Sequence, residues 1–271
     1  MRYTAGVLYC RRKMESVRWA FRYGAWSPGR TEWLLATSCV QAEEKARIGQ
    51  FVFTRDAKAA MAGRLLIRKL IADKLQIPWN EVLLQRTSKG KPFLVNDISR
   101  TYPSFNFNIS HHGEYAVLAA EVEFQVGVDI MKTELPGSGS IQEFFRIMMR
   151  QFTEKEWKSI KCAGSECSQL DMFYRYWALK ESFIKAIGVG IGFNLQRIEF
   201  NASPLQLEIG KMYKETSSFC NKYQLDPTEF TVFTFDDLVA SAVPLAPEDP
   251  TDWDNFNSKQ EPPVRQRTNS T

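Results

Sequence analysis

The sequence predicts an α+β fold in which helices pack on small antiparallel sheets. Residues 41–75 have the three- and four-residue apolar spacing of helices, and the same spacing returns between residues 141 and 187. Between these regions, residues 82–131 form short apolar stretches separated by turns. Their connections are too short for parallel crossovers, so we expect antiparallel strands. This order predicts two halves that meet near residues 121–126, with a site between them that draws residues from both.

The first half opens with two short strand-like stretches, VRWAF and EWLLA, separated by the turn sequence SPGR. Helical spacing then runs through QAEEKARIGQFVF and continues to residue 75, and Pro78 closes this region. The strands that follow are VLLQR, PFLV, FNFNIS, YAVLAAE and VGVDIM.

The second half begins after the Gly- and Ser-rich LPGSGS with a helix over IQEFFRIMM. Thr153 with Glu156 three residues later predicts a capping box at the start of the next helix. A longer helix is expected from about Gln169 to Ile187, where Gly188 ends it, and LQRIEF reads as a strand.

The last part of the chain changes in composition. From about Ala246 it is polar and Pro-rich, which predicts disorder. We therefore expect an N-terminal half over residues 1–122, a C-terminal half over 123–240 and a disordered tail over 241–271.

Composition narrows the function. The chain has 271 residues, 44% of them hydrophobic and 13% aromatic, which is enough for a core. Its 35 basic and 31 acidic residues give a net charge of +4, too little for a dedicated nucleic-acid binder but compatible with a local site for a phosphorylated small molecule. Five cysteines without a CxxC pair indicate neither a disulfide framework nor a zinc knuckle. Neither a bilayer-spanning run nor a secretory signal is visible, so we expect a cytosolic protein.

Three charged residues form the first candidate site. Asp129 ends the apolar stretch QVGVD, where an aspartate is either a turn former or a metal ligand. Glu181 and Lys185 are four apart on the predicted long helix and share one face, which is either a solvated edge or part of a site. Two carboxylates from separate elements could hold Mg²⁺ on a phosphate ester, with the lysine nearby.

Two loops offer further candidates. In FNISHHGEYAV, Ser110, His111 and the turn backbone suit a phosphate better than zinc, because the chain has only two histidines and no suitably spaced cysteine. The later GVGIG ends a helix instead of opening one, so it does not predict a dinucleotide loop.

Several basic residues of the first half are also candidates for binding a phosphorylated ligand. Arg86, Lys89 and Lys91 surround a Gly turn and either wrap a pyrophosphate or decorate a hairpin. Arg47 has the four-residue spacing to pair with Glu43 on a helix surface.

Taken together, these stretches resemble the 4′-phosphopantetheinyl transferases of the large, pseudo-dimeric type that activate fatty-acid, polyketide and peptide synthetases. The family is marked by a G-[VI]-D strand end and a W-x-x-K-E-[SA]-x-x-K helix, which correspond here to Gly127–Asp129 and Trp177–Lys185. Both motifs match in full, and the resemblance covers roughly residues 5–215. It implies two similar α/β halves in a pseudo-twofold arrangement, an active site in the cleft between them, and a monomer.

The resemblance also implies a reaction. The phosphopantetheine arm of coenzyme A would pass to a serine hydroxyl of acyl or peptidyl carrier protein domains, such as those of fatty acid synthase or of the aminoadipate-semialdehyde dehydrogenase type, with release of adenosine 3′,5′-bisphosphate. Asp129 and Glu181 would hold Mg²⁺, Glu181 would act as or position the general base, and Lys185 would contact the phosphates. The residues implied to bind coenzyme A are Arg47, Arg86, Thr87, Ser88, Lys89, Gly90, Lys91, Asn108, Ile109, Ser110 and His111, with Glu181 and Lys185.

The chain departs from the family in two places. Many bacterial members have a second acid where this chain has Met131, so two carboxylate ligands are offered, and water or His112 could complete the set. After Tyr213 we do not find the strand pair that normally completes the second half. Two alternatives therefore stay open: a shortened, non-catalytic form that binds coenzyme A or a carrier protein, and an unrelated magnesium-dependent nucleotide enzyme. Neither nucleic acid nor a membrane is an expected partner.

Overall fold

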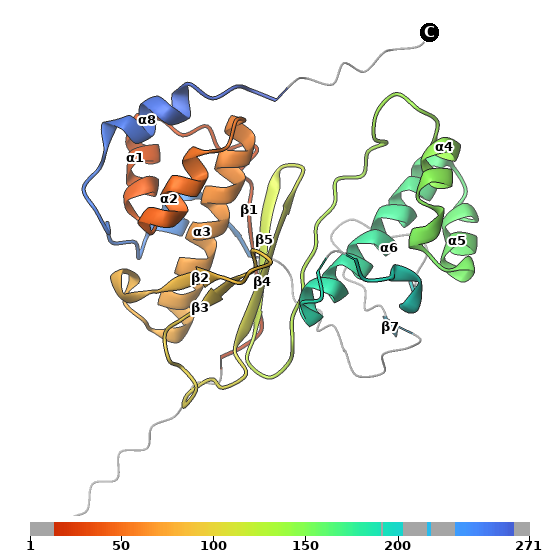
Figure 1. Ribbon diagram of the computed structural model, residues 1–271, viewed down its shortest axis with the longest axis horizontal. Coiled ribbons are helices and arrows are strands. Elements are labelled where there is room, and N and C mark those ends of the chain that lie inside the picture. The colour runs from red at the N-terminus through yellow and green to blue at the C-terminus, as the bar shows by residue number, and fades with distance from the viewer. Residues whose placement is uncertain (1–13, 191, 203–215, 218–230, 263–271) are drawn as a thin grey trace, which may run out of the picture.

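The computed structural model describes residues 14–190, 192–202, 216–217 and 231–262, which form an α+β structure of two lobes (Figure 1). The first lobe contains a four-stranded sheet covered by helices, and the second consists mainly of helices. No helix in these ranges is both long and apolar enough to cross a membrane.

The main sheet of the first lobe has the strand order β4-β5-β1-β8. Strands β4 (Asn106–His112) and β5 (Tyr115–Glu121) form an antiparallel hairpin, and β1 (Val17–Phe21) pairs antiparallel with β5. Gly113 has φ +62° in the hairpin turn, a conformation that favours glycine. The edge strand β8 (Thr231–Phe233) pairs parallel with β1, which the expected all-antiparallel pattern did not include.

Helix α3 (Thr54–Leu75) is the central helix of the first lobe and is mostly buried. It packs on β4 and β5, while α1 (Arg30–Ser38) and α2 (Ala42–Gly49) flank it. A Cβ on Gly63 of α3 would lie 3.0 Å from Ile109 Cδ1, so a small residue lets the helix approach β4 closely.

A small hairpin follows the short 3₁₀ helix η1 (Trp79–Glu81). Its strands β2 (Leu84–Arg86) and β3 (Pro92–Leu94) are antiparallel, as the sequence predicted, and residues 87–91 form its tip.

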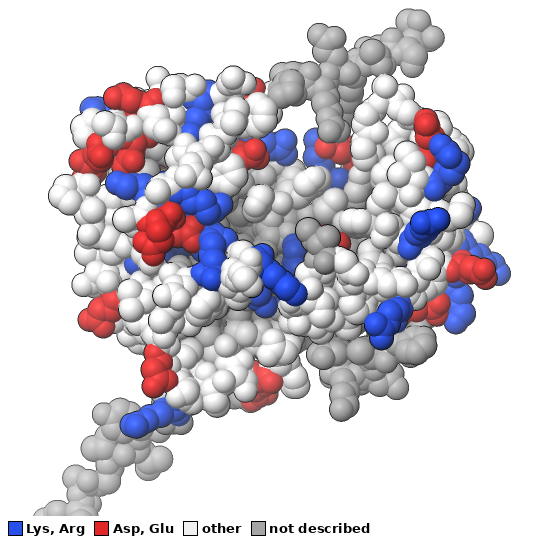
Figure 2. Space-filling model, in the orientation of Figure 1, with Lys and Arg blue, Asp and Glu red and all other residues white. Residues whose placement is uncertain are grey.

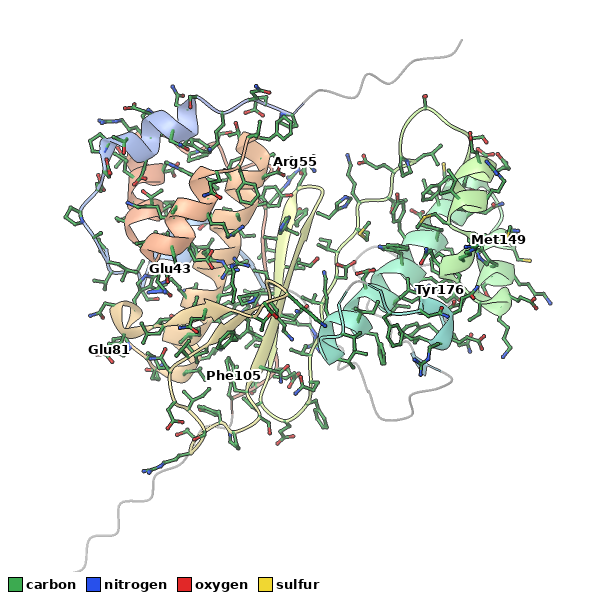
Figure 3. The ribbon with its side chains drawn as sticks, in the orientation of Figure 1. Glu43, Arg55, Glu81, Phe105, Met149 and Tyr176 are labelled. Atoms are coloured by element: carbon green, nitrogen blue, oxygen red, sulfur yellow. The ribbon has the colours of Figure 1, made fainter. Side chains whose placement is uncertain are left out.

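The second lobe is built on α6 (Glu166–Ile187), against which α5 (Glu154–Lys161) packs. Its core is aromatic, and Tyr176 points into it among the helices (Figure 3). The remaining elements are α4 (Ile141–Ile147), η2 (Met149–Gln151), η3 (Leu195–Arg197), β6 (Phe200–Asn201) and β7 (Thr216–Ser217). Two local predictions are confirmed: Thr153 and Glu156 form a capping box, and α6 ends at Gly188 with φ 71°.

A buried ion pair lies at the centre of the second lobe. Lys180 Nζ is 2.6 Å from Glu156 Oε2, and both side chains are 0% exposed. Lys180 also donates hydrogen bonds to the carbonyl oxygens of Leu195 and Ile198, at 2.8 and 2.9 Å. The lysine next to Glu181 in the motif therefore ties α6 to α5 and η3 instead of facing the pocket between the lobes.

The segment after residue 230 contradicts two predictions. The sequence predicts that residues up to 240 belong to the second half and that 241–271 are disordered, yet β8, α7 (Phe235–Val239) and α8 (Pro250–Asn257) pack on the first lobe. The rings of Trp33 and Phe256 stack at 3.8 Å between centroids, and Trp33 Nε1 donates a hydrogen bond to the Asp252 carbonyl oxygen at 3.2 Å. The polar average composition concealed a short helix that has an aromatic face and an N-cap at Asp249.

Three smaller predictions are also corrected. EWLLA lies in helix α1, because Glu32 Oε2 accepts a hydrogen bond from the Gly29 backbone nitrogen at 3.2 Å and the buried residues that follow have helical spacing. VGVDIM is an extended connection without ladder partners in the described ranges, and only the last residue of LQRIEF is in a strand. The region after Tyr213, where the family normally has a further strand pair, lies mostly outside the described residues, at 203–215 and 218–230.

Candidate active site

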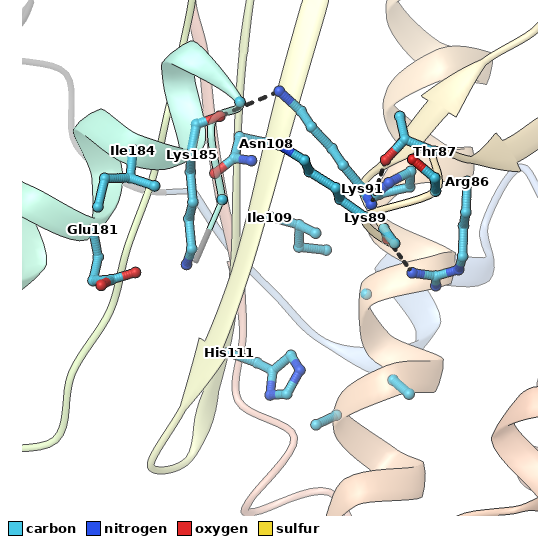
Figure 4. A pocket seen from close by; sticks show the side chains of 18 of the residues that line it. Arg86, Thr87, Lys89, Lys91, Asn108, Ile109, His111, Glu181, Ile184 and Lys185 are labelled. Carbon is cyan, nitrogen blue, oxygen red and sulfur yellow. Dashed lines mark hydrogen bonds between the residues drawn. The ribbon is translucent and has the colours of Figure 1, made fainter. Parts of the chain in front are cut away.

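A pocket of about 850 Å³ lies between the two lobes (Figure 4). Its first-lobe wall comes from α2, α3, the tip of the β2–β3 hairpin and β4. Its second-lobe wall comes from α6 and the segment that follows it. Among the described residues that line it, Glu181 is the one acid and six are basic: Arg47, Arg64, Arg86, Lys89, Lys91 and Lys185. Figure 2 shows basic side chains gathered around the hollow between the lobes.

Asp129 lies beside the pocket, and its side chain is 6% exposed. Its Oδ1 accepts hydrogen bonds from Ser110 Oγ at 2.8 Å and from Lys185 Nζ. Lys185 Nζ also donates to Ser110 Oγ at 2.8 Å. The other oxygen, Asp129 Oδ2, is buried and has no hydrogen-bond partner among the described residues. A buried carboxylate oxygen without a donor is costly unless another ligand satisfies it.

Gly127 explains how Asp129 reaches α6. A Cβ at this position would lie 1.9 Å from the Ser182 carbonyl oxygen and 2.7 Å from the Ala186 backbone nitrogen. Only glycine therefore lets the 126–130 segment cross directly over the backbone of α6. This close crossing places the carboxylate of Asp129 next to Lys185, one turn beyond Glu181 on the same helix.

Glu181 lines the pocket from α6. Burial raises the pKa of its carboxyl group, and the negative charge of Asp129 raises it further, while Lys185 opposes the shift. Two carboxylates thus stand close enough to repel each other, an arrangement that a bound cation would relieve. In the described part of the chain, no group of three or more His, Cys, Asp or Glu residues is placed to hold a metal.

The hairpin tip reaches across to the second lobe. Lys89 Nζ donates to the Val189 carbonyl oxygen at 2.8 Å, and Lys91 Nζ donates to the Lys185 carbonyl oxygen at 3.3 Å. The tip turns at Gly90, which has φ +82°. Basic side chains of the first lobe therefore lie beside the end of α6, at the same pocket as Glu181.

The structure brings most of the sequence-predicted residues into this one pocket. Of the residues assigned to coenzyme A, all but Ser110 line it, and Ser110 stands directly behind Lys185. Met131 instead packs against the core of the second lobe, and His112 Nδ1 accepts a hydrogen bond from the Lys132 backbone nitrogen at 2.8 Å. Burial lowers the pKa of His111, as does the charge of Lys185, so the neutral imidazole is favoured.

Sequence reasoning missed several lining residues. Arg64 from α3, Gln151 from η2 and Phe193 after α6 all line the pocket, and none has a recognisable motif. Arg47 pairs with Glu44 at 3.1 Å, not with Glu43 as predicted.

Comparison with curated proteins gives close relatives. The chain is 59% identical over 289 residues to the L-aminoadipate-semialdehyde dehydrogenase-phosphopantetheinyl transferase of Xenopus laevis, covering 94% of this chain and 96% of that protein. The human protein of the same name is 56% identical over 296 residues, with 95% and 96% coverage. A more distant relative, the 4′-phosphopantetheinyl transferase psf-1 of Bacillus pumilus, is 30% identical over 189 residues and covers 69% of this chain and 75% of its own.

The alignment with the Xenopus laevis protein also contains positions without a counterpart in this chain. It extends over 289 positions but contains 94% of a 271-residue chain, or about 255 residues, so about 34 positions have no counterpart here. The relative therefore contains about 34 residues in total that this chain lacks within the aligned region.

Two family models match adjoining parts of the chain. One, described as 4′-phosphopantetheinyl transferase, N-terminal, matches residues 24–123. The other, described as 4′-phosphopantetheinyl transferase superfamily, matches residues 125–243. Together with the close relatives, these matches confirm the resemblance seen in the two motifs: the chain belongs to the 4′-phosphopantetheinyl transferase superfamily.

Proposed function

We propose that this protein transfers the 4′-phosphopantetheine group of coenzyme A to a serine hydroxyl of an acyl carrier protein domain and releases adenosine 3′,5′-bisphosphate. The observation that carries the proposal is the convergence of Asp129, Glu181 and Lys185 at a pocket whose other charged lining residues, in the described part of the chain, are basic. Coenzyme A is a polyanion with a pyrophosphate and a 3′-phosphate, so it needs positive charge along its length and a reactive group at one point.

In the proposed reaction, the serine oxygen bonds to the phosphorus that carries pantetheine. The bond from that phosphorus to the bridging pyrophosphate oxygen breaks, and the bridging oxygen leaves with adenosine 3′,5′-bisphosphate. Glu181 takes the serine proton, directly or through water. Lys185 stabilises the charge that develops on the leaving oxygen.

Asp129 and Glu181 are the residues that would hold Mg²⁺. They fit this ion because Asp129 Oδ2 is buried without a donor among the described residues, and because the charge of Asp129 acts on Glu181. Magnesium commonly takes one or two protein carboxylates and completes its shell with water and phosphate oxygens. When bound, it would neutralise charge on the pyrophosphate. The position of Met131 in the hydrophobic cluster of the second lobe supports a set of two protein ligands.

The names of the relatives support carrier proteins of the aminoadipate-semialdehyde dehydrogenase type as partners. The pseudo-twofold relation of the halves, a monomeric state and a cytosolic location belong to the same proposal. The residues that this chain lacks within the aligned region favour a second candidate, a form that binds coenzyme A without turnover.

Intact-mass spectrometry tests the proposal. An apo acyl carrier protein incubated with this chain, coenzyme A and Mg²⁺ should gain the mass of one phosphopantetheine group, and EDTA should prevent the gain. Glu181→Gln should abolish the gain while the melting temperature stays near that of the unmodified chain. If no mass is gained but coenzyme A raises the melting temperature, the transferase proposal is wrong and the binding form is favoured.

A further inference from the structure

A buried glutamate holds three arginines at the pocket. Glu44 lies on α2 and is 6% exposed. Its Oε1 accepts hydrogen bonds from Arg64 Nη1 at 3.2 Å and Arg86 Nε at 2.9 Å. Its Oε2 accepts hydrogen bonds from Arg47 Nε at 3.1 Å and Arg86 Nη2 at 3.0 Å. Each carboxylate oxygen of Glu44 therefore accepts two hydrogen bonds from arginine side chains of the protein itself.

The three arginines come from three different elements and line the same pocket. Arg47 follows Glu44 on α2, Arg64 is on α3 and Arg86 is on β2, and each of them lines the pocket. Glu44 itself does not line it. The carboxylate thus stands behind the wall and fixes the guanidinium groups that face the ligand space.

The charges of this cluster do not balance internally. One carboxylate faces three guanidinium groups, and Arg64 is only 4% exposed, with a buried Nε that has no partner among the described residues. Burial lowers the pKa of Arg64 to about 10, so it stays charged at neutral pH. The side chains of Arg47 and Arg86 are 35% and 27% exposed, so the excess positive charge of the cluster is not fully buried and can attract an anion in the pocket.

The position of the Glu44–arginine cluster in the pocket indicates which phosphate of coenzyme A it would bind. Glu181 and Lys185 lie on one side of the pocket and Arg86 on the other (Figure 4). The reacting pyrophosphate belongs beside Glu181 and Lys185 in the proposed function. The remaining phosphate of coenzyme A, on the 3′ oxygen, is then the one left for the arginine side.

We infer that Glu44 is a positioning residue for the 3′-phosphate of coenzyme A, acting through Arg47, Arg64 and Arg86, and that Arg64 is a direct ligand of that phosphate. This inference rests on the proposed function. Guanidinium groups bind phosphate well when their planes are held in a fixed orientation, and the Glu44 carboxylate supplies that restraint from behind.

The test compares coenzyme A with 3′-dephospho-coenzyme A by isothermal titration calorimetry. The unmodified chain should bind coenzyme A more tightly. Glu44→Gln should weaken coenzyme A binding roughly ten- to a hundredfold, the worth of one or two charge-assisted hydrogen bonds. It should leave 3′-dephospho-coenzyme A binding nearly unchanged. Glu43→Gln is the matched control, because Glu43 is an exposed acid on the same helix that accepts a hydrogen bond from Gln41.

Electrostatics alone gives the opposite expectation. Removing a negative charge near a polyanion site should tighten binding if Glu44 only lowers the local potential. Tighter or unchanged coenzyme A binding by Glu44→Gln would overturn the inference, as would an equal loss for both ligands. Both constants come from one preparation, so their ratio does not depend on the folded fraction. If Glu44→Gln does not fold, Arg64→Gln should show the same selective loss, and equal weakening for both ligands would again refute the inference. If the unmodified chain binds no coenzyme A, the proposed function itself is wrong.

Discussion

Replacing Lys180 tests whether the two adjacent charged residues of the helix motif have separate roles. The Lys180 ammonium group is fully buried and pairs with Glu156, whereas Glu181 lines the pocket. The substitution Lys180→Met keeps most of the aliphatic volume of the lysine side chain but removes its positive charge and its three N–H donors. Glu156 would still accept hydrogen bonds from the backbone nitrogens of Thr153 and Phe200.

The expected cost follows from the groups that lose their partner. Removing one member of a buried ion pair costs about 3–5 kcal/mol, because the remaining charge is left uncompensated. Two carbonyl oxygens, of Leu195 and Ile198, also lose their donor. Domain stabilities are about 5–15 kcal/mol, so this loss is a large fraction of the whole. Lys180→Met/Glu156→Gln should recover roughly 1 kcal/mol or more of it, because removing the unpaired buried charge outweighs the loss of one of the two backbone N–H bonds that the carboxylate oxygens accept.

Urea unfolding with hydrogen exchange measures the cost and its location. Peptides from α6 and α5 should lose protection in Lys180→Met, while peptides from α3 in the first lobe keep theirs. Glu181→Gln is the matched control, since it changes the next residue of the same helix and should leave α6 protection unchanged. The reasoning is refuted if Lys180→Met loses less than about 1 kcal/mol, or if the double variant is no more stable than the single one.

Three further predictions concern other parts of the molecule. Gly127→Ala should lower the rate of carrier modification roughly a hundredfold, because the added Cβ collides with the Ser182 carbonyl oxygen and displaces Asp129; Gly49→Ala, with its nearest contact at 3.8 Å, should not lower it. Phe256→Ala should destabilise the first lobe by about 3–5 kcal/mol in urea unfolding, since this buried ring stacks on Trp33; an unchanged midpoint would mean that α8 does not stabilise the lobe. For Glu44, burial raises the pKa, but the hydrogen bond from Arg86 and the nearby arginine charges outweigh it and lower the pKa below the ordinary value. Its stabilisation should therefore be complete above about pH 4.3 and disappear as pH falls through the lower folded pKa, so unfolding free energies of the unmodified chain and Glu44→Gln should converge in acid.

Features that depend on neighbours in sequence could be predicted. The capping box at Thr153 and the end of α6 at Gly188 follow from residues within one helical turn. Strand β5 matches the predicted YAVLAAE stretch because its apolar run is bounded by the Gly113 turn. The expectation that Asp129 and Glu181 share one site was implied by the resemblance to the family and does not follow from any local rule.

Features that depend on tertiary contacts could not be predicted. Arg47 lies within helical reach of both Glu43 and Glu44, and sequence spacing favoured Glu43. Arg47 pairs with Glu44 because α3 and β2 bring Arg64 and Arg86 to the same carboxylate, from 20 and 42 residues away in sequence. In the sequence, each of these arginines has the pattern of an ordinary surface residue. Only the folded structure shows that they meet at one carboxylate.

After the second lobe the chain returns to the first lobe and adds a strand to its sheet. A parallel pair such as β1 and β8 needs a long crossover, and here the whole second lobe lies between the two strands in sequence. The returning segment then continues over the first lobe, where Lys259 Nζ donates hydrogen bonds to the carbonyl oxygens of Gly49 and Phe51, each at 2.8 Å. Phe51 lines the pocket, and the Arg47 guanidinium lies 5.3 Å from its ring centroid. The segment whose composition predicts disorder therefore supports the wall of the pocket that carries Arg47.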